Sequence, residues 1–213
     1  MKKKITIRIA NSPQIREFQK LLFRIYCQHL KWHDPSKFPN EIFTDEYDHL
    51  STFLTVYSGQ RLIAGVRLVP DSEKGFPHEK MSGGSLSLIE SSLIDERIKD
   101  AVKNVGRHKI MEATRFIGEP MIKGLHTYDL MKAVYWFGIY NEKKVYFMVI
   151  DMNTFLLLRK LCFPVVPIGI PVFCEGSWTI PAVILISDII SNLESSVRSY
   201  ILDTGNLAGK WQI

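Results

Sequence analysis

Charged residues interrupt three segments whose other residues are typical of strands. Asp45 and Asp48 stand in "TDEYDHL", just before the apolar run "TFLTVY". Arg67 lies inside "IAGVRLV", and Glu112 and Arg115 lie inside "MEATRF". An ionised group within a central strand destabilises a fold unless it is paired or opens onto a wet cleft. The pattern therefore predicts that these side chains, which are distant along the chain, meet around one polar cleft.

The chemistry open to this set follows from its residue types. The carboxylates outnumber the guanidinium groups by one, so the set favours a cationic ligand. A positioned carboxylate can take the proton of an ammonium group before the amine attacks, which contributes about 10² to 10⁴ in rate. Glu112 is the candidate base, with Asp45 and Asp48 holding the cationic side of the ligand. Arg67 and Arg115 can order the acids or bind a substrate carboxylate through paired hydrogen bonds.

A structural network of ion pairs is the alternative interpretation, with Arg67 paired to Asp48 and Arg115 paired to Glu112. Glu112 and Arg115 face opposite sides of a regular strand, because side chains alternate along it. A β-bulge near Thr114 would bring both side chains to one cleft, and we predict such a bulge.

Helical and strand-like segments alternate along the chain and would position these residues. Residues 5–9 alternate as in a strand, and Ser12 and Pro13 are typical of a helix start. "TFLTVY" and "RLIAGVRLVP", joined by "SGQ", are typical of a hairpin. Further strands are predicted at about 109–116, 144–150, 163–171 and 179–187, and helices at about 13–30, 86–102, 124–142 and 154–162.

This order predicts an α/β (α+β) fold with a mixed, twisted sheet and helices on both faces. The 213 residues, of which 46% are apolar, suffice for one substantial core, and no linker or repeat divides them. We predict one domain over residues 1–187 and a helical tail over residues 188–213.

Composition restricts the partners and the location of the protein. The net charge of +5 favours an acidic partner, but no nucleic-acid-binding motif occurs, so nucleic acid is not expected. The three cysteines form no C-x-x-C pair, and the six histidines, interpreted as surface or loop residues, form no metal-ligand pattern, so no metal is expected. No apolar run approaches a membrane span, and we predict a soluble, cytoplasmic protein without integral membrane contact.

Five motifs then occur in order: "RIYCQHLKW", "DEYD", "GVRL", "EATRF" and "LLLRKLCFPVVPIG". From about residue 20 to 186 the chain resembles the acyl-homoserine-lactone synthases, the autoinducer synthases of quorum sensing. The resemblance implies a GNAT-like acyltransferase fold whose sheet splays open for an acyl-pantetheine. It also implies that the amine of S-adenosylmethionine attacks the thioester of an acyl-carrier protein or acyl-CoA. The methionine carboxylate then closes a lactone and releases methylthioadenosine, with no permanently bound cofactor.

The resemblance assigns roles to residues at matching positions. The implied catalytic set is Asp45, Asp48, Arg67, Glu112 and Arg115. Tyr26 and Trp32 match the aromatic pair of the family, and Thr114 stands where the family usually has Ser. The family places an Arg four residues before the first aromatic residue, where this chain has Leu22, and Arg24 is the nearest substitute for binding the substrate.

The acyl donor is expected to contact two further sets of residues. Phe147 and Met148 would line the acyl-chain pocket, and the bulk of Phe147 favours shorter or unsubstituted chains. An acyl-carrier protein is acidic, so a basic docking surface is expected. The candidates for this surface are Lys143, Lys144, Arg159 and Lys160.

Two other functions remain open. A related acyltransferase that joins an acyl chain to a free amino acid would keep the sheet and the acidic cluster but lack lactone closure. The departures at Leu22 and at Tyr26, which replaces the usual Phe of the family, favour it. A non-catalytic, carrier-binding or regulatory protein on the same fold is the third hypothesis. The presence of Glu112 with both aspartates argues against it.

Overall fold

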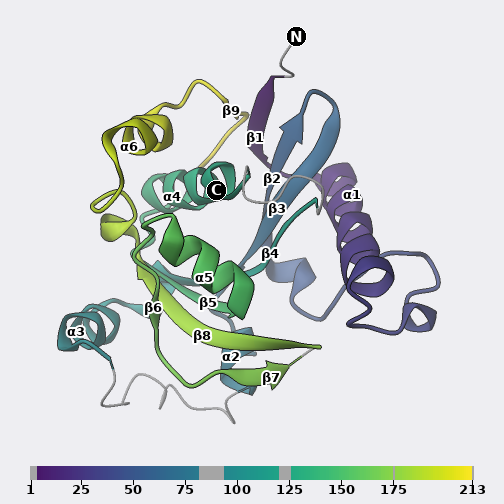
Figure 1. Ribbon diagram of the computed structural model, residues 1–213, viewed down its shortest axis with the longest axis horizontal. Coiled ribbons are helices and arrows are strands. Elements are labelled where there is room, and N and C mark those ends of the chain that lie inside the picture. The colour runs from purple at the N-terminus through teal and green to yellow at the C-terminus, as the bar shows by residue number, and fades with distance from the viewer. Residues whose placement is uncertain (1–3, 82–93, 120–125, 175, 213) are drawn as a thin grey trace.

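One mixed β-sheet carries the helices on its two faces (Figure 1). The computed structural model describes residues 4–81, 94–119, 126–174 and 176–212, and within these ranges nine strands form this sheet. The strands are β1 (Ile5–Ile9), β2 (Thr52–Ser58), β3 (Arg61–Pro70), β4 (Ile110–Gly118), β5 (Val145–Asp151), β6 (Val166–Pro167), β7 (Val172–Cys174), β8 (Ser177–Leu185) and β9 (Leu207–Ala208). Their order is β6-β8-β5-β4-β3-β2-β1-β9, with β7 paired to β8. The β4–β5 and β1–β9 pairs are parallel.

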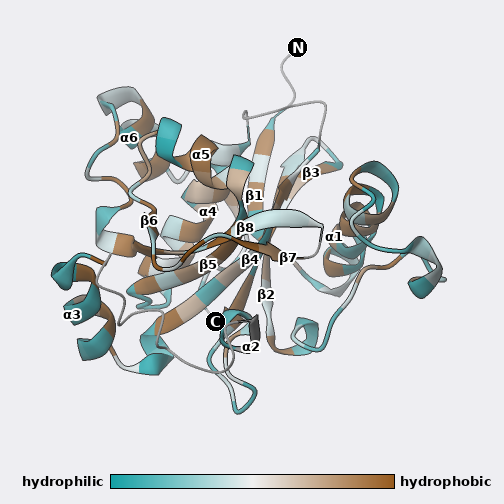
Figure 2. Ribbon diagram, turned by 60° about the horizontal axis from the view of Figure 1, so that its bottom comes forward, coloured by the Kyte–Doolittle hydropathy of each residue, from teal (hydrophilic) through white to brown (hydrophobic). Residues whose placement is uncertain are grey.

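The helices are α1 (Ser12–Phe23), α2 (Pro77–Met81), α3 (Glu96–Asn104), α4 (Thr127–Tyr140), α5 (Met152–Lys160) and α6 (Ser195–Leu202). α4 and α5 pack on one face of the sheet, where Leu54, Met111 and Met148 belong to the same core. α1 and its π-helical continuation over Arg24–His29 cover part of the other face, and α2 and α3 cover another part. The central strands are largely brown in Figure 2, whereas α3 is mostly teal. None of the helices in the described ranges is both long and apolar enough to cross a bilayer.

The fold predicted from the sequence is confirmed, with local differences. The helix cap is Asn11 and not Ser12, because the Asn11 side chain accepts from the backbone of Gln14 while the Gln14 side chain accepts from the backbone of Asn11. The strand predicted at 163–171 shrinks to β6, since prolines in that segment supply no N–H to a ladder. The first part of the helix predicted at 86–102 lies outside the described residues, and α3 corresponds to its second part.

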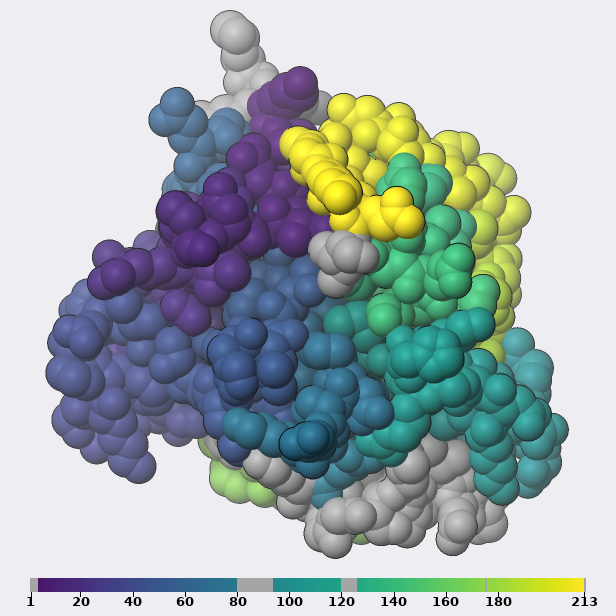
Figure 3. Space-filling model, turned by 180° about the vertical axis from the view of Figure 1, so that it is seen from behind, coloured from purple at the N-terminus to yellow at the C-terminus, as the bar shows by residue number. Residues whose placement is uncertain are grey.

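The C-terminal segment packs against the rest of the fold through several contacts. Trp136 of α4 donates from Nε1 to the carbonyl oxygen of Ile201, at 2.8 Å. β9 adds a parallel pair to β1 at the edge of the sheet. Figure 3 shows this segment, in yellow, lying against the purple N-terminal strand and the green surface of α4. The predicted tail thus contributes a strand to the sheet.

Two irregularities of β4 open the sheet. The ladder between β4 and β5 ends at the Ala113–Met148 pair, although both strands continue beyond it, so the two parallel strands diverge. On its other side, β4 places Arg115 and Phe116 opposite the single residue Val66 of β3. The bulge predicted near Thr114 is therefore present, with Arg115 at a positive φ of 54°. A non-glycine residue in this left-handed region costs about 1 to 3 kcal/mol, as is common at functional sites.

Candidate active site

A cleft of about 280 Å³ lies where β4 and β5 diverge. It is bounded on one side by the π-helical continuation of α1 and on the other by the start of α2, which contributes Pro77. Its walls also carry the polar and aromatic residues Tyr26, Trp32, Asp45, Glu46, Arg67, Glu112, Thr114, Arg115 and Asp151. Four of the five residues of the predicted charged set thus face one opening.

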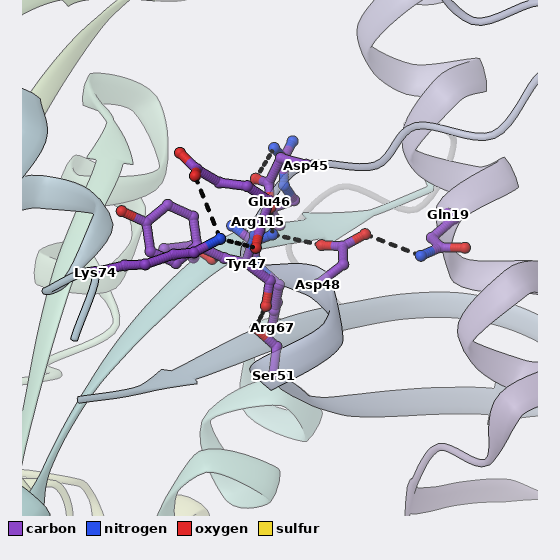
Figure 4. A network of polar contacts seen from close by, with 10 residues as sticks. Gln19, Asp45, Glu46, Tyr47, Asp48, Ser51, Arg67, Lys74 and Arg115 are labelled. Atoms are coloured by element: carbon purple, nitrogen blue, oxygen red, sulfur yellow. Dashed lines mark hydrogen bonds and ion pairs between the residues drawn. The ribbon is translucent and has the colours of Figure 1, made fainter. Parts of the chain in front are cut away.

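Arg67 holds the two aspartates together in front of the sheet (Figure 4). Its Nη1 lies 2.5 Å from Oδ1 of Asp45 and 2.5 Å from Oδ1 of Asp48. Its Nε donates to Oγ1 of Thr114 at 2.9 Å, so the strand behind it fixes the guanidinium. The second carboxylate oxygen of Asp48 accepts from Gln19 of α1 at 2.9 Å. Asp48 therefore fixes Arg67 without lining the cleft, while Asp45 is one of the residues that line it.

Asp45 is ionised at neutral pH. Burial raises the pKa of this carboxyl, but the hydrogen bond and charge of Arg67, together with those of Arg115, outweigh burial and hold the pKa far below its ordinary value. The Asp45 side chain is still 28% exposed, so its negative charge reaches the cleft.

The bulge aims Arg115 at the same carboxylate. Nη2 of Arg115 lies 2.7 Å from Oδ2 of Asp45, and the guanidinium carbon lies 4.4 Å from the centre of the Phe43 ring. Without the bulge, strand alternation would turn Arg115 toward the face of the sheet that α4 covers. The pairing that the sequence suggested as an alternative, Arg115 with Glu112, is not the one observed: Arg115 contacts Asp45.

Glu112 has a different partner. Its Oε2 accepts from the backbone N–H of His78 at 3.0 Å and lies 2.8 Å from Nδ1 of the same histidine. Glu112 is 0% exposed, and its Oε1 has no hydrogen-bond partner among the described residues. Glu112 is one of the residues that line the cleft.

His78 was missed by the sequence interpretation, which placed all histidines on the surface or in loops. It is 4% exposed and lies at the start of α2. No local signal identifies it, since its partner is 34 residues away in the chain. Asp151 was also missed, although "DMNT" is typical of a helix N-cap and Asp151 does cap α5.

The cleft is more acidic than predicted. Its walls carry the carboxylates of Asp45, Glu46, Glu112 and Asp151. Two guanidinium groups, those of Arg67 and Arg115, oppose them. The excess of negative charge favours a ligand with a positive centre.

A pair of aromatic side chains lines the cleft beside these charged groups. The rings of Tyr26 and Trp32 stack at 5.3 Å between centroids, with 29° between their planes. The π-helical turn makes this possible, because the carbonyl oxygen of Tyr26 accepts from the backbone of Trp32 at 2.8 Å. Aromatic faces beside a cleft attract cations and planar ring systems.

Three predicted substrate-binding residues do not line the cleft. Arg24 is exposed to solvent on the π-helical segment, while Leu22 is fully buried in the core beneath α1. Met148 points to the opposite face of the sheet, among the residues under α4 and α5, because it alternates with Phe147. Phe147 lies on the face that carries Glu112, but it packs against His78 and Phe76.

The four predicted docking residues are also absent from the walls of this cleft as far as the described residues go. Lys143 and Lys144 precede β5, at the end of the strand away from the divergence, and Nζ of Lys143 donates to the carbonyl oxygen of His108 at 2.8 Å. Arg159 and Lys160 are exposed at the end of α5. Docking by these residues stays a prediction.

The mixed, splayed sheet with a bulge in β4 is a GNAT-like fold, as the motifs predicted. No protein-family model and no curated protein sequence matches the chain.

Solved structures share this fold along nearly the whole chain. BjaI, a CoA-dependent acyl-homoserine lactone synthase solved with MTA, matches with a TM-score of 0.72 at 17% identity, over 97% of this chain and 93% of that one. The acyl-homoserine lactone synthase LasI matches with a TM-score of 0.65 at 14% identity, over 90% of this chain and 98% of that one. FeeM, an N-acyl amino acid synthase from uncultured soil microbes, matches with a TM-score of 0.63 at 11% identity, over 90% and 96%. The resemblance seen in the motifs is thus confirmed at the level of the fold.

Proposed function

We propose that this protein is an acyltransferase that makes an N-acyl-homoserine lactone from S-adenosylmethionine and an acyl thioester. One observation carries the proposal: Glu112, whose fully buried Oε1 has no described partner, lines an acidic cleft at the divergence of β4 and β5. Leaving such an oxygen unpaired costs about 1 to 3 kcal/mol or more, which a ligand that donates a hydrogen bond would recover.

The cleft suits the charges of S-adenosylmethionine. The molecule carries an ammonium and a sulfonium, and Asp45 and Glu112 offer carboxylate oxygens to them. The stacked pair of Tyr26 and Trp32 offers a surface for the adenine ring or the sulfonium. Arg67 acts through the aspartates that it holds, because its Nη1 and Nε are already bonded. BjaI has been solved with SAM and isopentyl-CoA, which supports this acceptor.

Acyl transfer begins with the acceptor amine. Oε1 of Glu112 takes a proton from the ammonium, and the free amine attacks the thioester carbonyl carbon. The oxyanion that forms would be stabilised by backbone N–H groups along the diverging strands, worth about 3 to 4 kcal/mol per donor where measured. The carbon–sulfur bond then breaks and an amide remains. The departing thiolate takes up the proton that the attacking nitrogen loses as the amide forms, and the proton held by Glu112 is released to solvent.

Lactone closure needs no further base. The methionine carboxylate oxygen attacks the side-chain carbon attached to the sulfonium, and the sulfur leaves as neutral methylthioadenosine. The acids around Arg67 would orient the sulfonium for this displacement. The acyl donor is a thioester of an acyl-carrier protein or of CoA. BjaI and MesI, both CoA-dependent, support the second donor for this fold.

The test supplies purified protein with S-adenosylmethionine and, in separate reactions, acyl-CoA and acyl-carrier-protein thioesters of several chain lengths. Mass spectrometry should detect methylthioadenosine and an N-acyl-homoserine lactone in equal amounts with one of the two donor classes. Absence of methylthioadenosine with every donor would contradict the proposal.

A second candidate function is supported by one observation. The arginine that the resemblance places at position 22 is a buried Leu22 here, and Arg24 faces solvent, so neither supplies a guanidinium to the cleft. An N-acyl amino acid synthase, such as FeeM of the same fold, would accept a free amino acid instead. In the same reactions, this enzyme would form an N-acyl amino acid from added amino acids and release no methylthioadenosine.

A further inference from the structure

The environment of His78 is unusual for a histidine at the start of a short helix. Its ring packs against two aromatic rings that also contact each other, with its centroid 5.7 Å from that of Phe76 and 4.7 Å from that of Phe147. The ring stacks nearly parallel to that of Phe76, with 17° between the planes. Phe147 is paired with Glu112 across the parallel strands β4 and β5. The histidine is therefore held by packing beside the buried Glu112 carboxylate.

His78 makes two hydrogen bonds to one oxygen of the Glu112 carboxylate. The backbone N–H and ring Nδ1 of His78 both reach Oε2, at 3.0 and 2.8 Å. An ionised carboxylate only accepts hydrogen bonds, so the ring contributes Nδ1–H as the donor. With two donors on Oε2, the carboxylate cannot rotate without losing both bonds, and Oε1 is the oxygen left for the cleft.

We propose that His78 is a positioning residue that directs Oε1 of Glu112 toward the acceptor amine, an inference that rests on the proposed function. The proton balance is the one already given: the ammonium proton moves to Oε1, and Oε2 keeps its two bonds to His78 throughout. His78 neither touches the substrate nor changes its protonation. Its contribution is orientation, which matters because a misplacement of about 1 Å can cost about 100-fold in rate.

Two substitutions separate this role from simple packing. His78→Phe keeps a ring packed against Phe76 and Phe147 but removes the Nδ1 donor. His78→Asn removes the ring but places an amide N–H near the position of Nδ1. We expect His78→Phe to lower kcat about 10- to 100-fold with little change in KM for S-adenosylmethionine. His78→Asn should recover most of that loss even if its melting temperature is the lower of the two.

The outcomes discriminate between the possibilities. If His78→Phe keeps kcat within twofold of the wild type, or if both variants lose kcat equally, His78 only packs and the inference is wrong while the proposed function stands. If the wild type forms neither methylthioadenosine nor an acylated product, the proposed function fails and the inference falls with it.

A second measurement does not depend on turnover or on the stability of a variant. In protein labelled with ¹⁵N-histidine, the His78 resonances are identified by their loss in His78→Asn. We expect Nδ1 of His78 to carry a proton. A bare Nδ1 with the proton on Nε2 would overturn the inference, because Glu112 would then have no ring donor.

Discussion

Two buried polar clusters lie on opposite faces of the sheet and differ in what surrounds them. The cleft cluster consists of Asp45, Asp48, Arg67, Glu112 and Arg115. The helix cluster lies where α4 meets the C-terminal segment. It consists of the buried residues His126, Asp129 and Lys132, the half-buried Tyr200 and the exposed Asp203 at its rim. In it, the Tyr200 hydroxyl donates to Asp129, and Nζ of Lys132 lies 4.3 Å from the centre of the Tyr200 ring.

The difference shows that burial of charge does not by itself mark a functional site. Lys132 is 0% exposed, and its Nζ has no hydrogen-bond partner among the described residues, much like Oε1 of Glu112. The C-terminal segment, however, lies over Lys132, whereas the divergence of β4 and β5 leaves a cleft beside Glu112. A buried polar group becomes available to a ligand where the packing leaves space next to it. The predictions below test this contrast, beginning with the largest expected effect.

Glu112→Gln should lower kcat about 10²- to 10⁴-fold, because the amide cannot take the ammonium proton. The melting temperature should change far less, since glutamine has the same shape. Steady-state release of methylthioadenosine and a thermal scan measure the two effects. Asp129→Asn is the matched change in the helix cluster and should leave kcat unaltered. Proportional losses of activity and stability in Glu112→Gln would mean that the cleft cluster is only structural.

Arg67→Met should lower the free energy of unfolding by about 3 to 5 kcal/mol, because it leaves Asp48 without a counter-charge and Asp45 with Arg115 alone. Urea denaturation followed by fluorescence measures this loss. Arg97, which is 62% exposed and paired with Asp188, is the control. Arg97→Met should cost about 0 to 1 kcal/mol. A similar small cost for Arg67→Met would show that Arg67 is not the link that holds the cleft cluster.

The stability of the protein should fall in acid through Asp45. Its pKa is lower in the folded than in the unfolded chain, so the unfolded chain binds the proton more readily. This contribution is complete above the ordinary pKa near 4 and is lost as the pH falls toward the folded value, on the order of 2 kcal/mol in total. Asp45→Asn should be less stable at pH 7 and should lose less between pH 5 and pH 2. If the free energy of unfolding of Asp45→Asn fell with decreasing pH as steeply as that of the wild type, Asp45 would not be the source of the loss of stability in acid.

Lys132→Met should be neutral or stabilise the fold by about 1 kcal/mol at pH 7, because an apolar side chain of similar size replaces a buried, poorly paired charge. Burial lowers the pKa of Lys132, and Asp203 and Asp129 offset this only in part. The unfolded chain therefore binds this proton more tightly, and the stability contributed by Lys132 rises with pH until the ordinary pKa near 10.4 is passed. Denaturation at pH 7 and pH 9.5 should show an increase in the free energy of unfolding of the wild type that Lys132→Met lacks. A loss of kcat in Lys132→Met would break the contrast between the two clusters.

Local patterns were sufficient for the elements of the fold. The hairpin of β2 and β3, the helices α1, α4 and α5, and the strands β4, β5 and β8 all follow from hydrophobic periodicity and turn residues, which act over short distances. The bulge at Arg115 also followed from the sequence, because alternation along a strand has a fixed period of two. The charges of the cleft cluster were recognisable because they interrupt apolar strands.

Contacts between distant segments decided the remainder. The sequence could not show that Arg24 faces solvent or that Arg115 pairs with Asp45, since each depends on how strands and helices meet in space. The partnership of His78 with Glu112 is of the same kind. Hydrophobic periodicity predicts which residues of a single helix or strand are buried. Only the packing of helices and strands against one another determines which polar atoms remain without a partner and where a cleft stays open beside them.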